Sequence, residues 1–240
     1  MIHKTAIIDP KAKINSDVKI GPYCVIGPNV EIGKNSIIQS HVSILGYTKI
    51  GENNNIYPFA SIGNDPQDLK FKGEQTKLEI GNNNKIREYV TINKGTDGGG
   101  GLTKIGNNCL FMVSSHIAHD CLVEDNVILA NNVPLGGHAH IEQNVIIGGN
   151  SAVQQFTRIG KFAMIGGMCG VVRDVIPYGI DQVVFRKISK SRFAFLQSLL
   201  PATAMCVGIV ALQQRPSVEE LFGVSLIIFA IVLRGRGNEY

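Results

Sequence analysis

The sequence predicts an all-β fold, a parallel β-helix of hexapeptide repeats followed by a short hydrophobic helical tail. Three observations support this prediction. Aliphatic residues recur every six positions, glycine follows many of them, and asparagine and glycine are concentrated between them. A period of six fits neither the 3.6-residue period of a helix nor a simple hairpin alternation. It fits a solenoid in which each face is one short strand followed by a turn.

The repeat keeps one register through most of the chain. Three hexapeptides make one triangular coil of eighteen residues, so the aliphatic side chains of successive coils point inward and stack into a continuous apolar core. We expect this β-helix to occupy residues 1–180. The twenty-five repeat positions are Ile8, Ile14, Ile20, Ile26, Ile32, Ile38, Ile44, Ile50, Ile56, Ile62, Ile80, Ile86, Ile92, Ile105, Phe111, Ile117, Val123, Leu129, Leu135, Ile141, Ile147, Val153, Ile159, Ile165 and Val171.

Between these positions, asparagine and glycine are expected at the turns because they tolerate positive φ. Asparagine runs occur at 53–55, 82–84, 107–108 and 131–132. The register breaks twice, at the polar segment 64–77 and at the glycine-rich segment 94–103. Each break marks a loop that leaves a coil, and insertions in a solenoid commonly gather on a binding face. Either loop taken alone could instead be a tolerated surface insertion.

After Ile180 the repeat stops, and residues 181–240 form a predicted second segment. Residues 193–212 carry no charge, and about 20 such residues can span a bilayer as a helix. A second apolar run, 221–233, is short for a span. The segment 191–204 resembles the last two helices of the drug and metabolite transporter superfamily. The sequence thus predicts a helical hairpin that contacts a membrane through 193–233, with two helices buried on a soluble partner as the alternative.

Composition limits the function classes. The formal net charge is +4 and the basic residues are scattered, so we expect no nucleic acid partner. The chain starts without a basic region and an apolar run, which predicts a cytoplasmic β-helix domain. Its five cysteines form an odd set without a Cys-x-x-Cys pair, and this favours a reduced compartment over a disulfide framework.

The segment 114–121 holds two histidines and a carboxylate. Eighteen residues per coil serve as a ruler for what lies beside them in the neighbouring coils. The ruler stacks His119 on Gly137 and Gln155, and Asp120 on His138. The ruler therefore brings His119, Asp120, His138 and the backbone of Gly136 and Gly137 into one patch, with His116 on the same coil.

This patch has a chemical logic. A neutral imidazole is the usual general base near pH 7, and Asp120 is placed to fix the tautomer of His119. Acyl transfer also needs a donor for the developing oxyanion, which the Gly137 N–H could supply without a side chain in the way. A single histidine is more often a hydrogen-bonded surface imidazole. The clustering of these residues is what predicts a catalytic site.

Several motifs in these coils are recognisable. They are His-Ile-Ala-His-Asp-Cys at 116–121, Ile-Leu-Ala-Asn-Asn at 128–132, Leu-Gly-Gly-His at 135–138, the segment 147–156 and Gln-Asp-Leu-Lys at 67–70. Over residues 1–180 the chain resembles the acyl-carrier-protein UDP-N-acetylglucosamine O-acyltransferases, which start lipid A biosynthesis. The resemblance implies a left-handed β-helix and a homotrimer with the active site between neighbouring subunits. It implies UDP-N-acetylglucosamine and an acyl carrier protein with a 3-hydroxyacyl chain as partners, with no cofactor and no metal.

On the matching positions the resemblance implies the roles of single residues. His119 would take the proton from the glucosamine 3-hydroxyl as this attacks the acyl thioester, Asp120 would orient His119, and the Gly137 N–H would stabilise the oxyanion. Gly167 would lie where the acyl tail ends. The residues that would hold the sugar nucleotide or the acyl chain are Asp68, Lys70, His116, His138 and Gln155.

The chain departs from the family pattern at three places. Asn93 and Gln154 stand where many members carry histidine, and the family's C-terminal helical domain is replaced after Ile180. Two alternatives stay open. The first is a zinc-dependent enzyme of the carbonic anhydrase type that would use His116, His119 and His138, although their spacing does not match that family. The second is an inactive or membrane-tethered hybrid of a β-helix with a transporter fragment.

Overall fold

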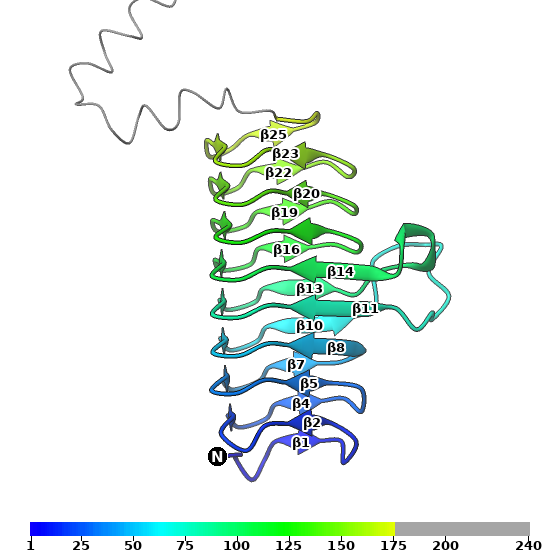
Figure 1. Ribbon diagram of the computed structural model, residues 1–240, viewed down its shortest axis with the longest axis vertical. Coiled ribbons are helices and arrows are strands. Elements are labelled where there is room, and N and C mark those ends of the chain that lie inside the picture. The colour runs from blue at the N-terminus through cyan, green and yellow to red at the C-terminus, as the bar shows by residue number, and fades with distance from the viewer. Residues whose placement is uncertain (176–240) are drawn as a thin grey trace, which may run out of the picture. The chain divides into compact units, whose positions relative to one another are not determined.

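The computed structural model describes residues 1–175, which form a stack of triangular coils with parallel strands on three faces (Figure 1). The first sheet contains, in spatial order, β1 (Ile7–Ile8), β4 (Val25–Ile26), β7 (Ser43–Ile44), β10 (Ser61–Asn64), β13 (Thr91–Asn93), β16 (His116–Ile117), β19 (Pro134–Leu135), β22 (Ala152–Val153) and β25 (Gly170–Val171). The second contains β2 (Lys13–Ile14), β5 (Glu31–Ile32), β8 (Tyr47–Ile50), β11 (Lys77–Ile80), β14 (Leu102–Ile105), β17 (Leu122–Val123), β20 (His140–Ile141) and β23 (Arg158–Ile159). The third contains β3 (Lys19–Ile20), β6 (Ile37–Ile38), β9 (Asn55–Ile56), β12 (Lys85–Ile86), β15 (Leu110–Phe111), β18 (Ile128–Leu129), β21 (Ile146–Ile147) and β24 (Met164–Ile165).

The eighteen-residue coil is confirmed by the register of the sheets. Ile8 pairs with Ile26, and Ile117 pairs with Leu135. Most strands are two residues long, and the second residue of each is the repeat position that points inward. These side chains are buried from Ile20 to Val171 and form one continuous apolar core. The hexapeptide pattern therefore specifies both the short strands and the core, because each inward residue packs on its equivalents one coil above and below.

Three corners join the three sheets. The first corner leads from the first to the second sheet, the second corner from the second to the third, and the third corner from the third back to the first. At the second corner a left-handed backbone conformation is taken by asparagine in six coils, as the sequence predicts, and by Phe162 in the last described one. The asparagines, with φ between 56° and 61°, are Asn35, Asn53, Asn83, Asn108, Asn126 and Asn144.

A second row of side chains lies buried inside the second corner. The backbone N–H of Asn84 donates to Asn54 Oδ1 at 3.0 Å, and that of Cys109 donates to Asn84 Oδ1 at 2.8 Å. The amide of Asn84 in turn donates to the Gly106 carbonyl at 3.0 Å. Both asparagines are almost fully buried. Their amides satisfy buried backbone groups that the short strands leave unpaired, so they are structural residues.

The third corner differs from the prediction that asparagine and glycine hold the turns. Its first four left-handed residues are Tyr23, His41, Phe59 and Tyr89, with φ between 57° and 65°. Their rings lie above one another with centroid separations of 5.0, 4.9 and 5.1 Å. Stacking between coils offsets the cost of a bulky residue in this conformation, because each ring packs on the next.

Both predicted insertions leave the β-helix at the first corner. One connects β10 to β11 and the other connects β13 to β14, and the second contains a short 3₁₀ helix, η1 (Asp97–Gly99). They lie side by side (Figure 1), joined by a hydrogen bond from the Gly95 N–H to the Lys77 carbonyl at 3.1 Å and by another from the Lys77 N–H to the Gly101 carbonyl at 2.8 Å. The prediction that the insertions gather on one face is confirmed.

The predicted helical tail lies outside the described residues. This applies to the domain boundary at 180, the segment 181–240 and the membrane contact through 193–233, which stay predictions. Within residues 1–175, no helix is long and apolar enough to cross a membrane.

Candidate active site

His119 and Asp120 lie at the first corner, directly after β16. Asp120 is in the left-handed conformation with φ of 58°. His119 Nδ1 lies 2.8 Å from Asp120 Oδ2, and the side chains are 15% and 1% exposed. A carboxylate at this distance accepts the Nδ1 proton, which leaves the lone pair on Nε2 as the basic site of the ring. The predicted histidine and its orienting carboxylate are therefore in contact.

The Asp120 carboxylate is held by the second insertion. Thr96 donates its N–H to Asp120 Oδ1 at 3.0 Å and its hydroxyl to Asp120 Oδ2 at 2.6 Å. The Asp120 N–H donates to Thr103 Oγ1 at 2.8 Å. These bonds compensate the burial of the carboxylate and fix its plane, since a buried charge needs donors around it. Thr96, Asp120 and His119 thus form a chain of hydrogen bonds that ends at the imidazole.

Gly137 lies one coil above His119 and against its ring. A Cβ on Gly137 would lie 2.6 Å from His119 Cε1 and 2.7 Å from Nε2, closer than real Cβ contacts. Only glycine therefore allows the imidazole its position. Within residues 1–175, the Gly137 N–H donates to no protein acceptor. The corner accordingly offers a basic nitrogen and an N–H donor from adjacent coils, as oxyanion chemistry requires.

The predicted stack continues upward through His138 and Gln155. The His138 ring meets His119 edge-on with centroids 5.1 Å apart, and its Nε2 lies 4.0 Å from Asp120 Oδ2. The other face of His138 is stacked on Phe156 at 4.3 Å. Gln155 is exposed and passes close to Gly136 in the coil below. The eighteen-residue ruler therefore predicted this arrangement correctly.

His116 lies on the coil of His119 and belongs to β16. Its Nδ1 is 2.7 Å from Thr91 Oγ1 in the strand below. Burial, and secondly the neighbouring His119, lower the pKa of His116 below that of an ordinary histidine. His116 is therefore a neutral imidazole at pH 7, which can exchange hydrogen bonds with a bound polar group without adding charge.

Within residues 1–175, three residues have ligand atoms that lie within 4.8 Å of one another, namely His119, Asp120 and His138. Two histidines and a carboxylate are a donor set that zinc accepts. Here, however, the carboxylate already accepts bonds from Thr96 and His119. The carbonic anhydrase alternative requires a different set of ligands, namely His116, His119 and His138. His116 is hydrogen-bonded to Thr91 instead.

Cys121 follows Asp120 and could suggest a thiol nucleophile. The side chain is buried, and burial is the main cause that raises its pKa to about 12. Its Sγ lies 3.2 Å from the Gly136 carbonyl. A thiol with this pKa is not ionised at neutral pH and does not attack an acyl group. The candidate reactive group at this corner is therefore the imidazole.

Asp68 and Lys70 belong to the first insertion. The Lys70 N–H donates to Asp68 Oδ1 at 3.0 Å, and the Phe71 N–H donates to the Asp68 carbonyl at 3.0 Å, so Asp68 forms a tight turn. Both predicted residues thus lie in an insertion that starts at the first corner, where His119 also lies. Gly167 lies elsewhere, because it follows β24 at the third corner, next to the Gly149 carbonyl. A single chain does not bring Gly167 to the imidazole.

Sequence reasoning missed two residues of the second insertion, one that binds the Asp120 carboxylate and one that leaves room for it. These are Thr96, whose bonds are given above, and Gly99, where a Cβ would overlap the Asp120 carboxyl group. The eighteen-residue ruler could not find them, since the insertion interrupts the register. A signal was nevertheless present, because four consecutive glycines at 98–101 indicate a close approach of backbone to another group.

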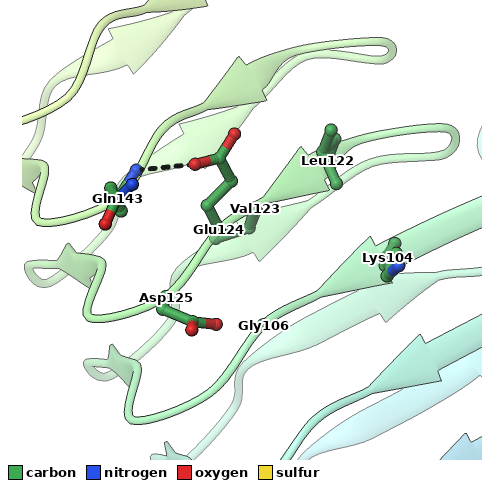
Figure 2. A pocket seen from close by; sticks show the side chains of 7 residues that line it. All are labelled: Lys104, Gly106, Leu122, Val123, Glu124, Asp125 and Gln143. Carbon is green, nitrogen blue, oxygen red and sulfur yellow. Dashed lines mark hydrogen bonds between the residues drawn. The ribbon is translucent and has the colours of Figure 1, made fainter.

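A shallow pocket lies on the outer face of the second sheet (Figure 2). It contains Lys104, Leu122 and Glu124, and Glu124 Oε2 accepts the Gln143 N–H at 3.2 Å. Glu124 Oε1 also lies 2.7 Å from His140 Nε2. None of the predicted site residues lines this pocket. Its two carboxylates are already paired, Glu124 with His140 and Asp125 with Asn107, which is the arrangement of a structural face.

Fold and site together define a hexapeptide-repeat transferase, and the family model described as "Bacterial transferase hexapeptide (six repeats)" matches residues 1–34 and 102–137. Three solved structures are similar. LpxA of Acinetobacter baumannii is 45% identical (93% of this chain, 89% of that chain, TM-score 0.76). UDP-N-acetylglucosamine O-acyltransferase of Moraxella catarrhalis is 42% identical (95%, 91%, 0.73). UDP-N-acetylglucosamine acyltransferase of Francisella novicida is 38% identical (83%, 78%, 0.76).

The chain belongs to the family of UDP-N-acetylglucosamine O-acyltransferases. Its parallel β-helix is the left-handed one of this family, as the resemblance implied. The carbonic anhydrase and hybrid alternatives, and the resemblance of the tail to transporters, find no support in these comparisons.

Proposed function

We propose that the protein transfers a 3-hydroxyacyl chain from acyl carrier protein to the 3-hydroxyl of UDP-N-acetylglucosamine, the first step of lipid A biosynthesis. Residues 1–180 are the proposed catalytic domain. The observation that carries the proposal is the chain from Thr96 through Asp120 to His119 Nδ1, which leaves Nε2 facing Gly137. The family relatives are named for acylating this sugar nucleotide.

In the proposed mechanism, His119 Nε2 removes the proton from the sugar hydroxyl as the oxygen attacks the thioester carbon. The carbon–oxygen bond forms, and the carbonyl oxygen takes up the negative charge of the tetrahedral intermediate. The Gly137 N–H donates to this oxygen. When the intermediate collapses, the carbon–sulfur bond breaks and the imidazolium returns the proton to the leaving thiolate. Asp120 stabilises the imidazolium throughout and remains ionised.

The other predicted residues have proposed binding roles. Asp68 and Lys70 would hold the sugar nucleotide from the first insertion, and His116, His138 and Gln155 would hold its sugar or the acyl chain. His138 is suited to this because Phe156 and His119 fix its ring on two sides. Gly167 lies at another corner, so its proposed contact with the acyl tail requires a neighbouring subunit. A homotrimer with the site between subunits would meet this requirement.

The test is His119→Ala, assayed for transfer from a 3-hydroxyacyl carrier protein to UDP-N-acetylglucosamine. We expect kcat to fall by roughly 10²- to 10⁴-fold, the contribution of a positioned general base. The matched control is His3→Ala, an exposed histidine bonded to Thr5 near the start of the chain. It should keep the wild-type rate. Undiminished turnover in His119→Ala would disprove the assignment of the base.

A further inference from the structure

The segment 93–96 connects the first insertion with the catalytic pair. Asn93 Nδ2 donates to the Asp65 carbonyl at 3.0 Å, and Thr76 Oγ1 donates to the Gly95 carbonyl at 2.5 Å. At its other end, Thr96 holds the Asp120 carboxylate. Four consecutive residues thus contact both ends of the first insertion and the group that orients the base. Within this segment, Lys94 contacts two further residues of the first insertion, Asp65 and Phe71.

Lys94 is a buried cation at the base of the first insertion. Its side chain is only 10% exposed, and Nζ lies 3.0 Å from Asp65 Oδ1. The same Nζ lies 4.9 Å from the centroid of the Phe71 ring. A buried ammonium group needs such partners, and an aromatic face and a carboxylate are the two that the loop offers. One charge therefore binds two points of the insertion.

These two points enclose the proposed sugar-nucleotide residues. Asp65 precedes Asp68 by three positions, and Phe71 follows Lys70 directly. Between them Pro66 is buried, whereas Leu69 is fully exposed and the described bonds of Asp68 are made within its own turn. Without the ammonium, Asp65 would keep its carbonyl bond to Asn93, but the part of the loop from 67 to 71 would lose its contact through Phe71.

We propose that Lys94 is a positioning residue for sugar-nucleotide binding, which holds Asp68 and Lys70 in place by its ion pair with Asp65 and its contact with Phe71. This inference rests on the proposed function for its substrate. The geometry of the clamp does not, because it concerns the protein alone. Lys94 touches neither the imidazole nor its carboxylate, so its loss should weaken binding more than the chemical step.

The main experiment compares Lys94→Met with wild type. Methionine keeps the length and apolar stem of the side chain but removes the charge. We expect KM for UDP-N-acetylglucosamine to rise by about tenfold, the scale on which misplaced positioning groups act, while kcat changes by less than about threefold. Lys85→Met is the matched control, an exposed lysine of β12 in the third sheet, and it should leave both constants unchanged.

A double-mutant cycle tests the mechanism of the clamp. Asp65→Asn removes the ion pair and should raise KM less than Lys94→Met, because Phe71 still contacts the ammonium. Adding Asp65→Asn to Lys94→Met should change KM little further, since both remove one interaction. Full additivity of the two effects would overturn the proposal. So would a Lys94→Met enzyme in which kcat falls as much as kcat/KM, because that pattern belongs to the chemical step.

Hydrogen exchange of the full-length protein separates the clamp from the proposed function. In Lys94→Met, the amides of 65–72 should exchange at least about tenfold faster, while those of the strands β16 to β23 remain as in wild type. Unchanged exchange at 65–72 would overturn the clamp whatever the activity. If the wild type transferred no acyl group but the exchange changed as stated, the proposed substrate would be wrong and the positioning of the loop by Lys94 would stand.

Discussion

The first and second corners of this β-helix have the same backbone and opposite uses. Both place a residue with positive φ in most of their turns. At the second corner that residue is asparagine in six coils. Inside this corner, the buried side chains of Asn54 and Asn84 accept hydrogen bonds from the backbone of the next coil. At the first corner the equivalent residues are Asp120, His138 and Phe156. If the first corner repeated the second, the β-helix would carry neither the two insertions nor the Asp120–His119 pair.

The comparison shows where a solenoid can change without losing its fold. Each coil is stabilised mainly by its neighbours through the inward side chains, so a corner is free to vary if its backbone groups stay satisfied. At the first corner the insertions supply that satisfaction, because Thr96 and Thr103 bind Asp120 in place of a ladder partner. We therefore expect substitutions at the regular corner to affect stability and substitutions at the interrupted corner to affect the proposed chemistry.

The largest expected difference between the corners concerns two aspartates. Asp120→Asn would remove the charge that holds the His119 tautomer, and we expect kcat to fall by about 10²- to 10³-fold, somewhat less than in the serine protease triad. Asp125 at the second corner accepts the Asn107 N–H at 2.7 Å. The measurement is steady-state transfer to UDP-N-acetylglucosamine by both variants.

Asp125→Asn is the control for this prediction. Asn82 and Asn107 already occupy the equivalent places in the coils below and accept the same kind of bond, so asparagine should fit at 125 without loss of activity. Equal rates for Asp120→Asn and wild type would contradict a special role of the first corner.

Two adjacent glycines of η1 sharpen the comparison within the second insertion. A Cβ on Gly99 would overlap the Asp120 carboxyl group, whereas one on Gly98 would meet nothing within 4 Å. We expect Gly99→Ala to lower kcat by about 10- to 100-fold, because a displacement of the carboxylate by an ångström misplaces the base. Gly98→Ala should retain wild-type kcat in the same assay. A pair of variants with equal activity would show that the approach of η1 to Asp120 has no catalytic consequence.

The second corner should respond in stability instead. Asn84→Ala would leave the buried Cys109 N–H and the half-buried Gly106 carbonyl without their partners. Unsatisfied buried groups cost about 1–3 kcal/mol each, so thermal unfolding should occur several degrees lower. Activity per folded molecule at 25 °C should be unchanged. A loss of kcat without a loss of stability would contradict the division between the two corners.

Much of the fold and of the candidate site could be predicted from the sequence, because the regular repeat shows which residues lie above one another in successive coils. The inward positions follow from the six-residue period, and the contact of His119 with Gly137 follows from one coil of eighteen residues. The aromatic stack from Tyr23 to Tyr89 could not be predicted from turn preferences, since its rings are stabilised by one another across coils and not by local backbone preference.

The insertions mark the limit of that ruler. Asp120 and Thr96 are 24 residues apart, a separation that is no multiple of the eighteen-residue coil. Their contact depends on where the loop folds back, and this is decided by bonds such as that between Gly95 and Lys77. The same holds for Lys94 and Phe71. The contacts of residues in an insertion can be identified only from the three-dimensional structure. The contacts between coils follow from the number of residues that separate them.

The smallest expected effect concerns the pH dependence of stability through His116, which lies in β16 directly before the first corner. The pKa of His116 is lowered in the folded protein, chiefly by burial, so the unfolded chain binds the proton more readily. Its contribution is therefore fully present above the ordinary histidine pKa near 6.5 and is lost as the pH falls below it. We expect the midpoint of thermal unfolding to drop between pH 7.5 and 5.5 by about 1–3 °C more in wild type than in His116→Asn. His3→Ala, which changes an exposed histidine, should follow the wild-type curve. If His116→Asn followed that curve as well, the burial of the imidazole would have no energetic consequence, and the first corner would resemble the second more closely than its hydrogen bonds indicate.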